Sequence, residues 1–234
     1  MKYVIRILRQ KFNSLEKYIE DFNYETNNPD ENIIYVLRKL NSMTPLLNSN
    51  GKETDLIEFE CACIQKKCGA CAMIINGEPM LACSFKLRDA KDEVIKLEPL
   101  KKFKTICDLV IDRQILQENL KTLKLWLEKD SNIKDKRREL NYEASECIQC
   151  GLCLEVCPNF YCGGSFYGFS SIVLTTRLLT ELDKMDRDII AKLYSKHNYS
   201  GCGKSLACKK ICPKKIDSEK MLVNANLLAI WKIK

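Results

Sequence analysis

Cysteines carry the chemistry that this sequence is expected to perform. The chain has 14 cysteines among 234 residues, and most of them lie in runs separated by two to four residues. Thiolates at such short intervals are typical of metal and iron–sulfur sites, whereas disulfide-dense scaffolds are usually small and secreted. We therefore interpret eleven of the 14 cysteines as ligands, in three groups.

The first group has three clustered cysteines and a distant fourth. Cys63, Cys68 and Cys71 form a C-x4-C-x2-C run, and Cys83 follows further along the chain. This is the ligand order of plant-type [2Fe–2S] sites. A structural zinc site is the alternative, but zinc sites more often contain paired C-x2-C knuckles. The spacing therefore favours a [2Fe–2S] cluster.

A short hairpin is expected to close this first site. Asn76 and Gly77 form a strong hairpin signal, so residues 72–75 and 79–82 are predicted to pair as strands. Their pairing would bring the fourth cysteine back beside the third. Gly69 would let the backbone approach the inorganic sulfide, because glycine has no Cβ.

The second group is a bacterial ferredoxin run. Cys147, Cys150, Cys153 and Cys157 are spaced C-x2-C-x2-C-x3-C, and Pro158 follows. In two-cluster ferredoxins the fourth cysteine of such a run ligates the other cluster. We expect the first three cysteines to ring one cluster from a tight loop, and the fourth to begin a helix and point elsewhere.

The third group repeats this run with one change, since Ser205 stands where the second cysteine should be. A cubane corner without a cysteine tends to lose its iron, so the crossing rule predicts one [4Fe–4S] and one [3Fe–4S] cluster. The predicted [4Fe–4S] ligands are Cys147, Cys150, Cys153 and Cys212. The predicted [3Fe–4S] ligands are Cys157, Cys202 and Cys208. A [4Fe–4S] cluster completed by the Ser205 oxygen is the alternative, and structural zinc knuckles are another.

Three cysteines and the single histidine fall outside these groups. Cys61, Cys107 and Cys162 are interpreted as small core or surface residues, and Cys61 as a buried one. His197 stands in a polar stretch, and we expect it in a solvated loop. With one histidine, a Rieske centre or a His-rich metal site is excluded.

The elements that position these groups change character near residue 105. Strands are predicted at residues 2–8, 17–25, 56–60 and 93–97, and a helix at residues 33–40 with Asp30 as its candidate N-cap. Further helices are predicted at residues 109–127, 172–182 and 218–231, with a charged linker or surface helix at 131–143. We therefore predict two domains, residues 1–105 and residues 106–234.

Composition and charge argue against several classes of protein. Hydrophobic residues make up 46% of the chain and charged residues 29%, which allows a packed core. No apolar run approaches the roughly 18 residues that span a bilayer, and no secretory signal pattern opens the sequence. The net charge of +7 leaves a zinc-stabilised nucleic-acid-binding module as an alternative, but it carries little weight. Eleven thiolates together with the positive cores of the oxidised clusters would bring the loaded protein close to neutrality.

With these runs in view, the chain resembles the iron–sulfur subunits of succinate dehydrogenase and fumarate reductase. Residues 68–73, 76–77 and 81–83 are similar to the first motif of that family. Residues 108–112 resemble the start of its inter-domain helix, and residues 147–153 are similar to the fumarate reductase form. The resemblance covers nearly the whole chain.

The resemblance implies an α+β fold: a β-grasp, plant-type ferredoxin-like domain followed by an all-α bacterial-type ferredoxin domain. It also implies two partners, an FAD-containing flavoprotein that interconverts succinate and fumarate and a membrane anchor that handles quinone near the [3Fe–4S] cluster. Electrons would pass through the [2Fe–2S], [4Fe–4S] and [3Fe–4S] clusters in either direction. The chain would lie peripherally on the cytoplasmic side of the cell membrane. None of its residues would perform acid–base or nucleophilic chemistry on a substrate.

Three residues depart from the family pattern. Lys66 stands in the first cluster loop where the family usually has glycine. Cys162 and Gly203 stand where many quinone-reducing members have tryptophan and histidine. The last two changes affect the family's quinone pocket, so we expect menaquinone rather than ubiquinone. The alternative is a subunit for thiol-linked fumarate reduction, or for glycolate or glycerol 3-phosphate oxidation.

Overall fold

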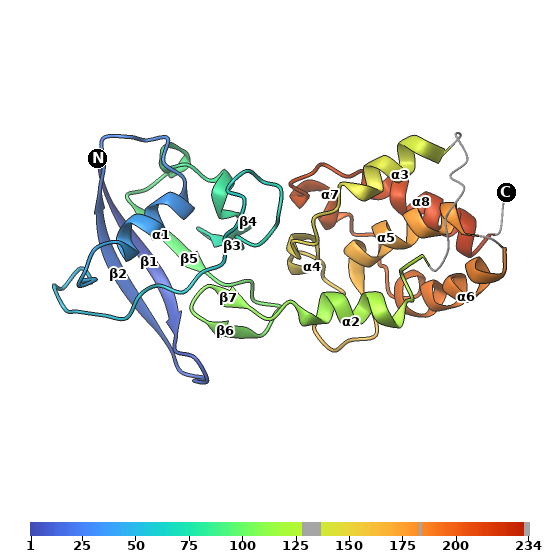
Figure 1. Cartoon of the computed structure of the whole chain (residues 1–234), viewed down its shortest axis with the longest axis horizontal. Helices are drawn as coiled ribbons and strands as arrows, with labels where there is room; N and C mark the ends of the chain where they lie inside the picture. The colour runs from blue at the N-terminus through green and yellow to red at the C-terminus, as the bar shows by residue number, and fades with distance from the viewer. Residues whose placement is uncertain (128–136, 183, 232–234) are drawn as a thin grey trace. The chain divides into compact units, whose positions relative to one another are not determined.

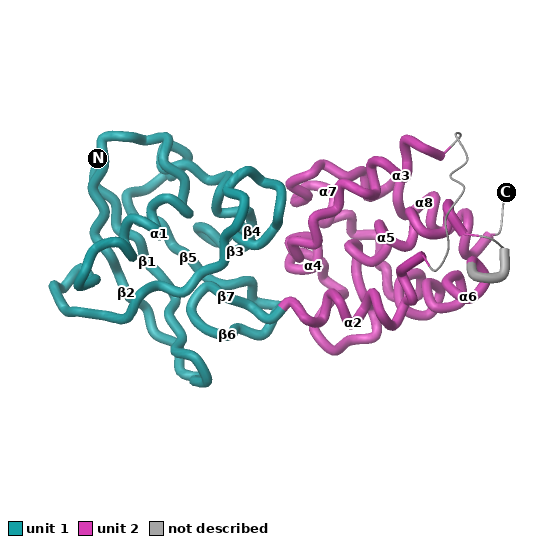
Figure 2. The backbone as a smooth tube through the Cα atoms, viewed as in Figure 1, with its two compact units in different colours: residues 1–112 teal, residues 113–234 magenta. Residues whose placement is uncertain are grey.

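The computed structural model describes residues 1–127, 137–182 and 184–231 (Figure 1). The chain divides into two compact units, Met1–Asp112 and Arg113–Lys234 (Figure 2). The sequence analysis placed a boundary after residue 105. The first unit extends beyond that residue because β6 (Thr105–Cys107) pairs with β7 (Val110–Ile111) and contacts the first strand of the sheet.

The first unit is built on a five-stranded mixed sheet with the strand order β2-β1-β5-β3-β4. β1 (Lys2–Gln10) pairs antiparallel with β2 (Lys17–Glu25) and parallel with β5 (Val94–Glu98). β3 (Ala72–Ile75) pairs antiparallel with both β5 and β4 (Glu78–Leu81). The strands predicted in these segments are therefore confirmed, with ends that shift by one or two residues.

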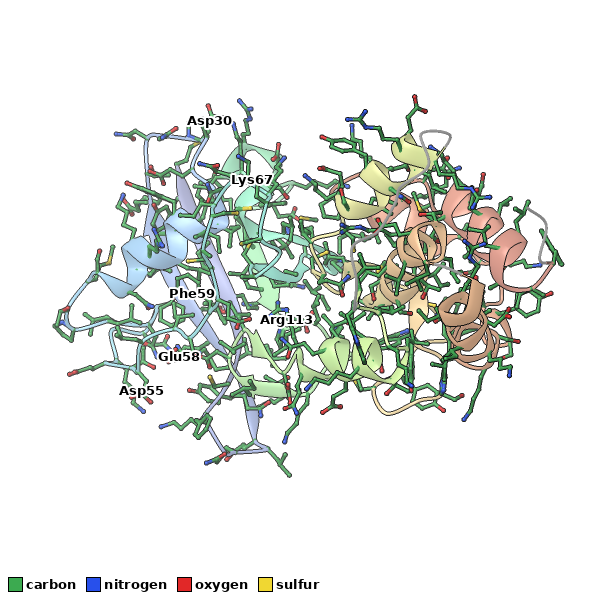
Figure 3. The ribbon with its side chains drawn as sticks, turned by 45° about the vertical axis from the view of Figure 1, so that its right-hand side comes forward. Asp30, Asp55, Glu58, Phe59, Lys67 and Arg113 are labelled. Atoms are coloured by element: carbon green, nitrogen blue, oxygen red, sulfur yellow. The ribbon has the colours of Figure 1, made fainter. Side chains whose placement is uncertain are left out.

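Helix α1 (Ile33–Asn41) covers the sheet with an apolar face. Its buried residues are Ile33, Ile34, Val36, Leu37 and Leu40. Asn32 caps the helix, because its side-chain oxygen accepts the Tyr35 N–H at 3.0 Å. The predicted cap Asp30, labelled in Figure 3, instead forms an ion pair with Lys86 at 2.8 Å.

Residues 56–60 form no strand, so the strand predicted there is wrong. Side chains take the place of a neighbouring strand. Arg9 Nη2 donates to the Leu56 carbonyl at 3.0 Å, and Asp108 Oδ2 accepts the Glu58 N–H at 2.9 Å. Buried backbone groups need such partners. These bonds hold the segment that leads into the first cysteine loop.

The Arg9 side chain, only 2% exposed, is the centre of a buried ion network. Its Nε donates to Asp108 Oδ1 at 2.9 Å, and its Nη1 donates to Glu20 Oε2 at 3.1 Å. The helix predicted at residues 109–127 is wrong at both ends. Strand β7 occupies its start, and α2 spans only Gln114–Thr122.

The described elements of the second unit are all helical. Besides α2 they are α3 (Arg138–Ser145), α4 (Leu152–Glu155), α5 (Gly168–Glu181), α6 (Lys184–Tyr194), a π-helical turn (Ser195–Tyr199), α7 (Ala207–Ile211) and α8 (Ser218–Ala229). The helices predicted near α5 and α8 are confirmed, and the segment predicted at 131–143 lies outside the described residues up to 136. No helix among the described residues could cross a membrane.

Helix α5 forms the core of this unit. Twelve of its 14 residues are buried, and it contacts α3 and α8. The Thr176 hydroxyl donates to the Ile172 carbonyl at 2.8 Å and lies 3.1 Å from the Met221 carbonyl of α8. A helix buried on most sides gives the cysteine loops around it a fixed support.

Candidate iron–sulfur sites

The loop after Cys63 directs backbone N–H groups at a cysteine sulfur. The Gln65 and Lys67 N–H groups donate to Cys63 Sγ at 3.3 and 3.2 Å, and Lys67 is labelled in Figure 3. These bonds lower the pKa of Cys63 to about 7, because hydrogen bonds stabilise its thiolate form. The loop therefore favours the ionised sulfur that an iron–sulfur cluster needs.

Left-handed backbone residues make this loop possible. Ile64, Lys66 and Gly69 have φ values of +53°, +59° and +77°. Lys66 thus adopts a conformation that glycine reaches more easily. A non-glycine residue in this region costs about 1–2 kcal/mol. The structure thus accepts strain at Lys66 that glycine would avoid.

The third and fourth cysteines of the first group lie side by side at the base of a hairpin. The Ala82 N–H donates to the Cys71 carbonyl at 2.9 Å, and Cys71 and Cys83 are both buried. Asn76 and Gly77 have φ values of +51° and +86°, as a two-residue hairpin turn requires. The predicted return of Cys83 to Cys71 is confirmed.

Burial raises the pKa of Cys71 to about 12, with the neighbouring Cys83 thiol adding to the effect. A second thiolate beside it would be unfavourable unless a positive charge compensated both. The iron ions of a cluster supply that charge. The donor set therefore fits a [2Fe–2S] cluster.

Cys61 stands just before this loop and is only partly buried. The prediction of a buried residue is wrong for this cysteine, because no strand turns it into the core. Its sulfur accepts a hydrogen bond from Arg38 Nη2 at 3.4 Å. Cys61 is thus tied to helix α1.

In the second unit, two cavities take cysteines from both ferredoxin runs. The first cavity is small and partly open to solvent. Its cysteines are Cys147, Cys150, Cys153 and Cys212. Apolar side chains such as Phe169, Val173 and Ile216 form much of the remaining wall.

The second cavity is similar in size to the first. Its cysteines are Cys157, Cys202 and Cys208. Ser205 lines the same cavity, at the place of the missing cysteine. Phe169 of α5 borders both cavities. The structure thus gathers the same two sets of residues that the crossing rule predicts.

Short helices produce this crossing. Helix α4 separates Cys150 from Cys157, and α7 separates Ser205 from Cys212, so the last cysteine of each run follows a helix. The expectation that this cysteine begins a helix is wrong. Helices α4 and α7 contact each other, so the end of each run lies near the other run.

Burial shapes the thiols of these cavities. It raises the pKa of Cys150 to about 11, and it is also the main cause of the raised pKa values of Cys153 and Cys208. Several buried thiols that resist ionisation need cations at the centre of the cavity before they become thiolates. Iron–sulfur clusters provide them. Both cavities therefore suit clusters.

Among the described residues, the side chains are not arranged as the ligands of a single zinc ion. No three histidine, cysteine, aspartate or glutamate side chains gather there closely enough to hold a single metal ion. Zinc–sulfur bonds are about 2.3 Å, so zinc ligands must converge tightly. Ligands of a multi-iron cluster stand further apart.

The residues outside the ligand groups have varied environments. Cys107 is partly buried, and Cys162 is exposed. The prediction for His197 is wrong: it is 8% exposed, its ring stacks on Tyr167 at 4.4 Å, and its Nδ1 lies 3.0 Å from the Ser165 carbonyl oxygen. The π-helical turn carries this histidine inward.

Gln149 is a residue of the first cavity that the sequence did not indicate. Its side chain lines the cavity, and its Nε2 donates to Cys147 Sγ at 3.2 Å. The only signal in the sequence is an amide side chain between two cysteines of the run.

Comparisons with known proteins agree with this architecture. Residues 4–118 match the family described as a 2Fe-2S iron-sulfur cluster binding domain, and residues 143–216 match the 4Fe-4S dicluster domain. A chain of the Mycobacterium smegmatis Sdh1 complex has a similar fold, with a TM-score of 0.79 at 22% identity over 100% of this chain and 98% of that one.

Two curated relatives cover most of the chain. The succinate dehydrogenase iron–sulfur subunit of Bacillus subtilis is 32% identical over 222 residues, which is 90% of this chain and 85% of that protein. The fumarate reductase iron–sulfur subunit of Escherichia coli O6:H1 is 31% identical over 170 residues, which is 69% of each. The chain belongs to the family of iron–sulfur subunits of succinate dehydrogenase and fumarate reductase, components of oxidoreductase complexes.

Proposed function

We propose that this chain relays electrons between an FAD-containing flavoprotein subunit and a quinone, menaquinone, at a membrane anchor. Three clusters form the relay. The [2Fe–2S] ligands are Cys63, Cys68, Cys71 and Cys83. The [4Fe–4S] ligands are Cys147, Cys150, Cys153 and Cys212, and the [3Fe–4S] ligands are Cys157, Cys202 and Cys208. The quinone would bind near the [3Fe–4S] cluster, with the chain held peripherally at the cytoplasmic face of the membrane.

The crossed arrangement of the two cavities carries this proposal. Each cavity is lined by cysteines from both runs, which stand more than forty positions apart in the sequence. Four cysteines surround one cavity, and three cysteines with Ser205 surround the other. That difference supports a [4Fe–4S] cluster in the first cavity and a [3Fe–4S] cluster in the second.

The residues of this chain bind the clusters and control their surroundings. Iron–sulfur clusters, when bound, accept and release single electrons. The cysteine thiolates hold them, and backbone donors such as the Gln65 N–H stabilise the ligand sulfurs. Phe169, between the two cavities, excludes water from their shared wall. The protein thus tunes the clusters through ligands, hydrogen bonds and burial.

A different electron partner is the second candidate function. It is favoured by the loop near the second cavity, where the backbone of Gly203 packs closely against the Asn159 side chain. A Cβ added at Gly203 would lie 3.0 Å from Asn159 Nδ2, and that nitrogen already donates to the Gly201 carbonyl at 2.7 Å. A larger side chain at this position would have to displace Asn159. Gly203 thus stands where many quinone-reducing members of the family have histidine, and this difference favours a different electron partner.

Metal analysis and electron paramagnetic resonance (EPR) of anaerobically purified full-length chain test the cluster assignment. We expect about nine irons per chain, the sum of the three clusters. A [3Fe–4S] signal should be present in the oxidised sample, and a [2Fe–2S] signal should develop on reduction with dithionite. A colourless protein that holds zinc would refute the proposal.

Co-purification tests the partners. The flavoprotein that binds this chain should oxidise succinate or reduce fumarate, and the assembled complex should react with a menaquinone analogue faster than with a ubiquinone analogue. A flavoprotein active only on glycolate or glycerol 3-phosphate would favour the second candidate. If the complex holds its clusters but does not react with quinone, the proposed electron relay would stand and the proposed quinone acceptor would be refuted.

A further inference from the structure

Gln149 occupies a special place in the first cavity of the helical unit. It stands between Cys147 and Cys150 with a left-handed φ of +51°. Its side-chain Nε2 donates to Cys147 Sγ at 3.2 Å. Gln149 thus directs an amide donor at one predicted ligand of the [4Fe–4S] cluster.

The other end of the same amide supports a functional role. Gln149 Oε1 is buried and has no hydrogen-bond partner among the described residues. Leaving a buried acceptor unsatisfied costs about 1–3 kcal/mol. An apolar side chain of similar size, such as leucine, would fill the space without that cost. The hydrogen bond from Gln149 Nε2 to the Cys147 sulfur therefore explains why an amide stands at this position.

We propose that Gln149 is a positioning residue that raises the reduction potential of the [4Fe–4S] cluster by hydrogen bonding to the Cys147 thiolate. This inference rests on the proposed ligand assignment. Reduction adds one negative charge to the cluster and its sulfurs. An N–H donor stabilises the more negative form more strongly, so it favours the reduced cluster.

The second ferredoxin run offers a matched position. Lys204 stands between Cys202 and Ser205 in the same left-handed conformation, with a φ of +55°. Its side chain is exposed. The backbone at the two positions is thus alike, and the side chains differ in what they reach. A substitution at Lys204 is therefore a control for changes in the run that leave the Cys147 sulfur untouched.

The test is a redox titration of the full-length chain, followed by EPR, in four proteins. They are the wild type, Gln149→Leu, Gln149→Met and Lys204→Leu. In both Gln149 variants we expect reduction of the [4Fe–4S] cluster to become about tenfold less favourable, a decrease of about 59 mV for one electron. The [2Fe–2S] potential in each protein serves as an internal reference, and Lys204→Leu should leave the [4Fe–4S] potential unchanged.

The outcomes separate the inference from the proposed function. An unchanged or raised [4Fe–4S] potential in both Gln149 variants overturns the inference. Loss of the [4Fe–4S] cluster from both variants also overturns it, because Gln149 would then serve assembly rather than potential. A wild-type protein without a [4Fe–4S] cluster would instead refute the ligand assignment. Leucine and methionine differ in shape, so a change in potential that both variants share is not caused by the packing of one side chain.

Discussion

The two ferredoxin runs of the helical unit follow nearly the same backbone path with different side chains. Gln149 and Lys204 have φ values of +51° and +55°, and two residues later Gly151 and Leu206 have φ values of +84° and +57°. A short helix follows in each run, and then a cysteine and a proline. The comparison teaches that the path of the loop does not depend on the second cysteine of the run.

Two of the sequence differences affect the cavity and the turn directly. Ser205 replaces the cysteine, which changes the number of sulfur ligands around the cavity. Leu206 takes the left-handed position that glycine fills in the first run, at a cost of about 1–2 kcal/mol. The second run thus accepts strain to keep the same turn. The predictions that follow test each part of this comparison.

The crossing of the two runs should give the largest effect. Cys212→Ala should remove the [4Fe–4S] signal and keep the [3Fe–4S] signal, because Cys212 lines the first cavity. Cys157→Ala should do the reverse, since it lines the second. EPR and iron analysis of the anaerobic chains measure both. Cys162→Ala, at an exposed cysteine, is the control. Opposite losses would mean that each run serves its own cavity.

Ser205→Cys should change the second cavity by one metal ion. A fourth thiolate would complete the cubane corner, so the oxidised protein should lose its [3Fe–4S] signal and gain about one iron per chain. Ser205→Ala is the matched variant and should keep the [3Fe–4S] signal. A loss of iron in Ser205→Ala would show instead that the serine oxygen ligates a fourth iron.

The left-handed positions should affect stability more modestly. Gly151→Ala should lower the free energy of unfolding by about 1 kcal/mol, because alanine has a Cβ that disfavours positive φ. Leu206→Gly should give a smaller change, since relief of strain is offset by lost side-chain contacts and greater unfolded-chain entropy. Anaerobic denaturant unfolding followed by circular dichroism compares them. A loss in Leu206→Gly as large as in Gly151→Ala would mean that the side-chain contacts of Leu206 outweigh its backbone strain.

The smallest effect is expected from the ion pair that joins the two runs. Lys214 Nζ lies 2.7 Å from Glu146 Oε2, so the residues after Cys212 are tied to those before Cys147. Lys214→Met should lower the free energy of unfolding only slightly, and less in high salt. Denaturant unfolding at low and high salt provides the measurement, with Lys210→Met as the surface control. A larger loss would make the pair a main support of the crossing.

The same pair has a defined pH dependence. The hydrogen bond and charge of Glu146 raise the pKa of Lys214 above its ordinary value. A raised folded-state pKa means that the pair stabilises the fold below the ordinary lysine pKa, and that this contribution is lost as pH rises through the folded value. The wild type should therefore lose its small advantage over Lys214→Met only in strongly alkaline solution.

Local signals explain which elements were predictable. The strands around Asn76 and Gly77 and the helix after Asn32 carry turn residues and apolar periodicity, and they form as predicted. The segment at 56–60 has the composition of a strand, but most of its backbone hydrogen bonds are made with side chains. No local pattern shows that a distant arginine and aspartate will satisfy its backbone. His197 was misplaced for the same reason, because its burial depends on Tyr167.

The intervals between cysteines, read from the sequence by itself, determined the three groups, the crossing and the exceptional place of Ser205. Such intervals are local, because two to four intervening residues limit which cysteine sulfurs can reach the same cluster. The tertiary structure alone decided which side chains would meet those groups. Arg9 and Asp108 stand 99 positions apart in the sequence, and the amide of Gln149 reaches Cys147 only through a left-handed turn. Contacts of this kind depend on the folded backbone, which residue spacing does not specify.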